Sequence, residues 1–86
     1  MRRDPEFFED VELTLVYMAR RLPDALKLEG LFSDAGVDFL VETGTYTGGI
    51  LIRRDLTGAF FYVTAETVEK AREVLRRNRY KPYEPE

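Results

Sequence analysis

Apolar residues alternate along one segment of this chain and recur at helical spacing in the next. Residues 11–18 show a period of two, which predicts a strand. One predicted face holds Val11, Leu13, Leu15 and Tyr17, and the other holds Glu12, Thr14, Val16 and Met18. From Pro23 onward the spacing predicts a helix whose buried stripe is Ala25, Leu28, Leu31, Phe32 and Ala35. A strand followed at once by an amphipathic helix favours a fold in which helices cover one face of a sheet.

The end of this helix is marked by a glycine. Gly36 is expected in the left-handed conformation, with Val37 placed to touch Phe32 as part of the helix cap. Gly30 lies inside the helix, where glycine costs about 1 kcal/mol relative to alanine. We therefore expect another backbone to approach Gly30 closely. Leu26 points away from the buried stripe and is a candidate for a contact outside the core.

Three further strands are predicted, at residues 37–42, 50–53 and 59–63. Residues 54–58 are expected to form a five-residue hairpin loop between the last two strands. The alternative is that these two strands form one bent hairpin arm. Thr64 is expected to cap a second helix, whose predicted buried face is Val68, Ala71, Val74 and Leu75.

This order of elements predicts an α+β fold. The expected architecture is a ferredoxin-like sandwich, with two helices on one face of an antiparallel sheet and a possible short last strand. One domain spans residues 1–86, with a short N-terminal arm (1–10) and a C-terminal arm (78–86). The first arm starts a single helical turn at Asp4 and Pro5. The second arm is either a short edge strand or an arm that crosses a neighbour.

Composition limits the chemistry of the chain, which has no cysteine, histidine or tryptophan. The lack of histidine removes the commonest general base and zinc ligand, so we expect no enzyme, no metal and no cofactor. A small α+β barrel enzyme that uses a carboxylate and a tyrosine is the alternative.

The net charge of -3 disfavours nucleic acid and anionic membranes as partners. No apolar run approaches the roughly 20 residues of a membrane span, and no secretory signal opens the chain, so a cytoplasmic protein is expected.

The stretch "GTYTGG" (44–49) raises the question of a ligand loop. Phosphate-binding loops place glycines between a strand and a helix, whereas these glycines lie between two predicted strands. The stretch is therefore predicted to be a connection in which glycines supply positive φ or a bulge. The alternative is a small-effector site at residues 43–49. Its candidate ligand-binding residues are Gly44, Tyr46, Gly48, Gly49, Arg53 and Tyr62.

Apolar and aromatic residues on both strand faces exceed what two helices can cover. A domain of this size also gains from burying surface against another molecule. We therefore expect a homo-oligomer formed through the sheet, with a dimer favoured. The candidate interface residues are Val16, Met18, Leu40, Leu51, Phe60 and Tyr62. A protein partner or a small effector is the other expected ligand.

Cationic residues cluster at the end of the second predicted helix. They are Arg76, Arg77, Arg79 and Lys81. Such residues complement the negative end of a helix. Alternatively, they bind an anionic partner or the acidic segment of a neighbouring chain, which contains Glu6, Glu9, Asp10 and Glu12.

Four segments carry a resemblance to a known family: "LVYMA", "ALKLEGLFSDAGVDFLVE", "GTYTGG" and "GAFFYVTAETVEKAREVL". Over roughly residues 13–76 the chain resembles small bacterial domains of unknown function that are described as signal-transducing proteins. These domains are related in fold to the PII (GlnB-like) nitrogen regulators. The resemblance implies a self-associating ferredoxin-like domain with a regulatory or binding role. It places "TGTYTGG" where PII relatives carry their effector loop. No residue here matches the PII nucleotide-binding residues, so the resemblance implies no particular ligand.

Overall fold

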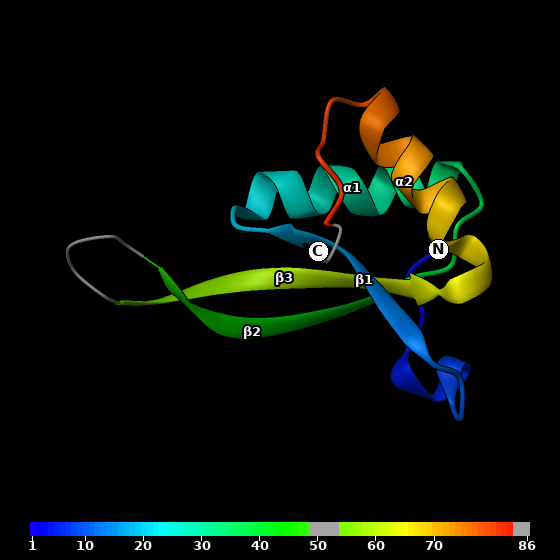
Figure 1. The fold of residues 1–86 in the computed structure, drawn as a ribbon, viewed down its shortest axis with the longest axis horizontal. Coiled ribbons are helices and arrows are strands. Elements are labelled where there is room, and N and C mark those ends of the chain that lie inside the picture. Colours follow the sequence, from blue (N-terminus) through cyan, green and yellow to red (C-terminus); the bar gives the residue numbers. More distant parts are fainter. Residues whose placement is uncertain (49–53, 84–86) are drawn as a thin grey trace.

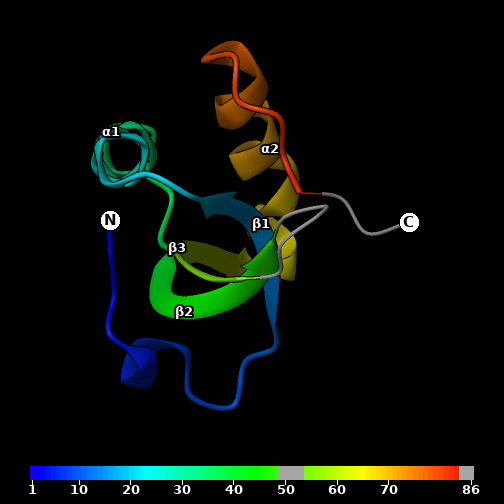
Figure 2. The ribbon, with the colours of Figure 1, turned by 90° about the vertical axis from the view of Figure 1, so that its left-hand side faces the viewer.

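The computed structural model describes residues 1–48 and 54–83 as an α+β fold (Figure 1). The elements in chain order are η1 (Pro5–Phe8), β1 (Leu13–Ala19), α1 (Leu22–Asp34), β2 (Leu40–Gly48), β3 (Arg54–Thr64), η2 (Ala65–Thr67) and α2 (Val68–Arg77). The strands form an antiparallel sheet in the order β1-β3-β2. Both α-helices lie on one face of this sheet (Figure 2). The predicted ferredoxin-like sandwich is confirmed in its strand–helix–strand–strand–helix form.

Strands β2 and β3 form one long hairpin, which projects past the helices (Figure 1). Their pairing runs without interruption from Leu40 and Tyr62 to Gly48 and Arg54. Residues 54–58 therefore belong to a strand, and the predicted loop at these positions was wrong. The predicted strand at residues 50–53 lies outside the described residues, so the alternative of a single bent arm stays a prediction. Asp55 and Gly58, which were interpreted as loop residues, are held in the strand because their backbones pair with β2.

A β-bulge interrupts the pairing of β1 with β3. Leu15 pairs with Tyr62 and Tyr17 pairs with Phe61, so Val16 is an extra residue without a partner in register. Directly opposed residues of an antiparallel pair point to the same face of the sheet. The bulge therefore places Tyr17 on the helix face with Phe61.

The same bulge moves Met18 to the outer face, where it pairs with Phe60. Tyr17 was predicted to share a face with Leu13 and Leu15. This prediction was wrong, because the bulge lies between Leu15 and Tyr17 and turns Tyr17 to the helix face. An alternating pattern cannot reveal the extra residue, because a bulge changes the phase of the strand without changing its composition.

The main core lies between the sheet and the two helices. Three buried rings meet there: Phe32 lies 5.5 Å from Phe39 and 6.0 Å from Phe61 between ring centroids. The helices contribute most of their predicted stripes, namely the buried residues Ala25, Leu28, Phe32, Ala71, Val74 and Leu75. Val68, Leu31 and Ala35 are partly buried against the same core. Both predicted helix faces are confirmed.

Helix α1 ends as the sequence predicts. Gly36 has a φ of 74°, and the N–H of Val37 donates to the carbonyl of Phe32 at 2.9 Å. This is the Schellman arrangement.

Within helix α1, a Cβ built on Gly30 would meet no atom within 4 Å, so the expected close approach of another backbone was wrong. Leu26 points outward as predicted and is 59% exposed.

Helix α2 begins differently from the prediction. Thr64 precedes the short turn η2, and α2 itself begins at Val68. The Thr64 hydroxyl lies 2.8 Å from the hydroxyl of Thr67 and caps no backbone N–H. The two threonines therefore brace the turn that leads from β3 into α2.

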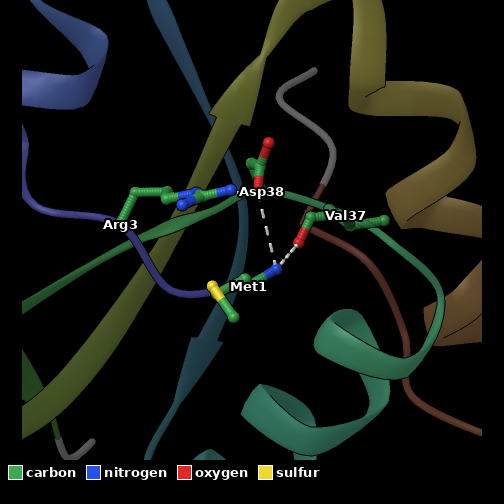
Figure 3. A network of polar contacts seen from close by, with 4 residues as sticks. All are labelled: Met1, Arg3, Val37 and Asp38. Atoms are coloured by element: carbon green, nitrogen blue, oxygen red, sulfur yellow. Dashed lines mark hydrogen bonds and ion pairs between the residues drawn. The ribbon is translucent and has the colours of Figure 1, made fainter.

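The first residues of the chain lie beside the segment that leads into β2 (Figure 3). The N–H of Arg3 donates to the carbonyl of Phe39 at 2.8 Å, and the N–H of Phe39 donates to the carbonyl of Met1 at 3.1 Å. The Met1 ammonium donates to the carbonyl of Val37 and lies 3.7 Å from the Asp38 carboxylate. Arg3 Nε donates to the same carboxylate at 2.9 Å.

After these contacts the chain passes to the side of the sheet opposite the helices (Figure 2). There η1 confirms the predicted single turn.

Candidate functional site: a basic groove lined by tyrosines

An open groove of about 1010 Å³ lies where the end of β1, the start of α1 and the segment after α2 meet. Five cationic side chains line it: Arg20, Arg21, Arg76, Arg79 and Lys81. Three tyrosines also line it: Tyr17, Tyr80 and Tyr83. Asp24 is the acidic residue among the lining side chains. The groove thus concentrates positive charge on a chain whose net charge is -3.

The connection between β1 and α1 brings two of these arginines to the groove. Ala19 ends β1 as a buried residue, and Leu22 begins α1. Arg20 and Arg21 fill the two positions between them, and Arg21 has an extended backbone. A connection this short fixes both side chains at the junction of strand and helix.

The C-terminal end of α2 brings the other cations, through a cap that contains an unusual residue. The N–H of Tyr80 donates to the carbonyl of Leu75 at 2.8 Å, and the N–H of Arg79 donates to the carbonyl of Arg76 at 3.0 Å. These are the two bonds of a Schellman cap, and Arg79 has a φ of 66°. The corresponding residue at the end of α1 is Gly36. Arg79 therefore adopts a left-handed conformation that favours glycine.

After this cap the chain returns along β1. The N–H of Tyr83 donates to the carbonyl of the bulge residue Val16 at 2.7 Å, and Pro82 is buried. Tyr80 packs edge-on against Tyr17, with ring centroids 5.4 Å apart. Residues 80–83 form no strand of their own, but they lie beside β1, whose other edge pairs with β3. This segment closes one side of the groove.

The polar groups in the groove favour an anionic ligand that also has an apolar part. Burial raises the pKa of the Tyr17 hydroxyl above its ordinary value of 10.0, and the Asp24 carboxylate and Tyr80 add to the rise, while Arg20 opposes it. Tyr17 is therefore a hydrogen-bond donor at neutral pH. Arginine guanidinium groups bind carboxylates and phosphates through paired hydrogen bonds. Tyrosine rings offer flat apolar surface beside them.

The residues proposed for an effector loop do not form a loop in the described part of the chain. Gly44, Tyr46 and Gly48 lie in β2 and pair with residues of β3. Gly49 and Arg53 fall outside the described residues. Tyr62, at the other end of β3, pairs with Leu40 and Leu15, and no described contact joins it to the glycines.

Gly44 also has a different role from the one expected. Among the described glycines only Gly36 has a positive φ, so Gly44 supplies neither a turn nor a left-handed residue. A Cβ at Gly44 would lie 2.9 Å from Cε2 of Phe60. Glycine is present there because the Phe60 ring occupies the space that a side chain would need.

The six expected interface residues divide into three groups. Val16 was predicted as an interface residue, but it is 0% exposed in the main core and therefore offers no surface to a partner. Leu40 is only 6% exposed. Leu51 falls outside the described residues. The remaining three are half-buried and lie on the outer face: Met18, Phe60 and Tyr62.

The groove itself was only half predicted. The cationic cluster after α2 was recognised in the sequence, but its association with Arg20 and Arg21 was not. A sequence signal does exist, because "YMARR" and "RNRYKPY" each place tyrosine close to arginines. Only the packing of α2 and the return of residues 80–83 along β1 bring these two segments together.

Comparisons of this chain with protein-family models, with curated proteins and with solved structures find no match. The relation to PII regulators therefore stays a prediction.

The described α-helices are α1 and α2. Neither has the length and apolar character needed to cross a bilayer.

Proposed function

We propose that this chain is a non-enzymatic binding module that takes an anionic group into the basic groove. The observation that carries the proposal is the convergence of five cationic side chains and three tyrosines on one groove. The chain as a whole has a net charge of -3, so its other surfaces carry an excess of acidic residues. A concentrated patch of one sign raises the local concentration of ligands of the opposite sign.

The backbone of Arg79 supports the proposal independently of charge. A residue with a side chain costs roughly 1–2 kcal/mol in the left-handed region, and Gly36 fills the equivalent position after α1. Non-glycine residues held in such conformations cluster at functional sites. We propose that an arginine stands at this position because its guanidinium group is needed in the groove, and not because the helix cap needs it.

The biological setting follows from the resemblance noted in the sequence. It favours a self-associating domain that acts in signal transduction through a protein partner or a small effector. The composition and the apolar strand faces add a cytoplasmic location and a homodimer as expectations. In this proposal the effector binds in the groove and not at residues 43–49. The charges and tyrosines of the groove support this change, because they suit an anionic ligand.

The test is a titration of the protein with inorganic phosphate and pyrophosphate at low and high ionic strength, followed by tyrosine fluorescence and NMR amide shifts. Binding should shift amides at residues 17–21 and 79–83, and it should weaken with salt. Lys81→Glu should weaken binding by about tenfold or more, which corresponds to about 1.4 kcal/mol.

Arg77→Glu is the matched control, because it reverses the same charge in the last turn of α2. Arg77 pairs with Glu73 and does not line the groove. Its reversal should leave the anion affinity within about twofold, because charges on the exposed surface are screened. Equal losses in the two variants, or no binding of either anion by the parent protein, would count against the groove.

A further inference from the structure

We infer that the anionic group is the acidic N-terminal segment of a second copy of this chain, an inference that rests on the proposed function. Residues 4–12 of the sequence contain five acidic residues and no basic one. All five are exposed: Asp4, Glu6, Glu9, Asp10 and Glu12. The segment and the groove therefore carry opposite charge and are both accessible.

The segment also has a fixed shape. The N–H of Val11 donates to the carbonyl of Phe8 at 2.9 Å, and the Phe8 side chain is buried. Between them Asp10 has a φ of 61°, a left-handed conformation that aspartate tolerates better than most residues. Glu9 and Asp10 thus lie at the tip of a tight turn. A ligand held in one shape loses little conformational entropy when it binds.

Apolar groups flank these carboxylates in a way that suits the tyrosines of the groove. Phe7 is 54% exposed and Val11 is 49% exposed, on either side of the acidic tip. In the groove, Tyr80 and Tyr83 lie beside the cations. Carboxylates can meet guanidinium groups while the apolar side chains pack on tyrosine rings, which matches the segment in both kinds of contact.

A chain cannot place its own segment in its own groove. Residues 4–12 come before the first residue of β1, whereas Tyr17 and Met18, near the other end of this strand, line the groove. Figure 1 shows the course of β1 between these two ends. A strand of seven residues spans about 20 Å. The segment is also held at both ends, by the pairing of residues 1–3 with 37–39 and by β1 itself. The occupant must therefore come from another molecule.

Because the two surfaces differ, each copy offers one segment and one groove. Two copies related by a twofold axis exchange both segments, and copies arranged head to tail form rings or open chains. Either arrangement depends on charge pairs at the rim of the interface between the copies. Association should therefore weaken as the salt concentration rises.

Native mass spectrometry and sedimentation velocity at low and high ionic strength test the inference. The parent protein should associate, and Glu9→Lys or Lys81→Glu alone should weaken association by about tenfold or more. An equimolar mixture of the two variants should regain association, because reversed charges then face each other. Asp34→Lys, which reverses an exposed acid at the end of α1, should associate like the parent protein.

The outcomes separate this inference from the proposed function. A monomer that still binds pyrophosphate in the groove overturns the inference and leaves the binding module in place. A protein that neither associates nor binds pyrophosphate overturns both. An oligomer that persists unchanged in Glu9→Lys and in Lys81→Glu also overturns the inference, because it must use another surface, such as the outer face of the sheet.

Discussion

The ring of Phe60 lies over Gly44, diagonally across the β2–β3 hairpin. Gly44 pairs with Gly58, and Phe60 pairs with Glu42 two residues further along. A Cβ at Gly44 would come within 2.9 Å of Phe60 Cε2. Glycine inside a strand normally weakens it, and an aromatic ring packed over the glycine compensates for the missing side chain.

Gly44→Ala should therefore destabilise the protein, even though alanine restricts the unfolded chain more than glycine does. We expect a loss of about 1 kcal/mol in the free energy of unfolding, because the Phe60 ring must move away. In a Phe60→Ala background the same substitution should be neutral or stabilising. Urea unfolding of the four proteins in this double-mutant cycle measures the coupling. Additive effects would show that the ring and the glycine are independent.

The two glycines of α1 should respond in opposite ways to alanine. Gly30→Ala should raise the free energy of unfolding by up to about 1 kcal/mol, because the site is open and alanine favours the helix. Gly36→Ala should lower it by about 1 kcal/mol, because φ is 74° at this position. Thermal unfolding of both variants compares the two directly. A loss in Gly30→Ala would reveal a contact made outside this chain.

Replacing Arg79 with glycine should separate stability from binding. Glycine relieves the left-handed backbone, so the free energy of unfolding should rise by about 0.5 kcal/mol. The affinity for pyrophosphate should fall at the same time, because a guanidinium group is lost from the groove. Arg79→Lys is the control that keeps both the charge and the backbone strain, so its stability should match that of the parent protein. A parallel loss of stability and affinity in Arg79→Gly would assign Arg79 a structural role.

Tyr17 should make the protein less stable at alkaline pH. Its pKa is raised in the folded state, chiefly by burial, so the unfolded chain releases the proton first as pH rises. Stability should therefore be unaffected by this group well below pH 10 and should fall above it. Tyr17→Phe should flatten the dependence of the unfolding midpoint between about pH 9 and about pH 11. An unchanged slope in Tyr17→Phe would show that other groups cause the alkaline loss.

Local signals in the sequence were enough to predict most of the elements. The stripe of α1, its glycine end and the buried face of α2 depend on residues within a few positions of each other, so periodicity and capping reveal them. The choice between a loop and a strand at residues 54–58 was harder. Asp55 and Gly58 favour a turn locally, but pairing with β2 satisfies their backbone groups in an extended conformation.

The sequence by itself determined the α+β class, the buried faces of both helices, and the cationic character of the segment after α2. Only the tertiary structure decided which faces of β1 are buried, because the bulge at Val16 depends on pairing with β3. Only the tertiary structure likewise brought Arg20 and Arg21 to the C-terminal cations, through the return of residues 80–83 along β1. Helix periodicity is set by neighbours along the chain, whereas strand register and the groove are set by contacts between distant residues.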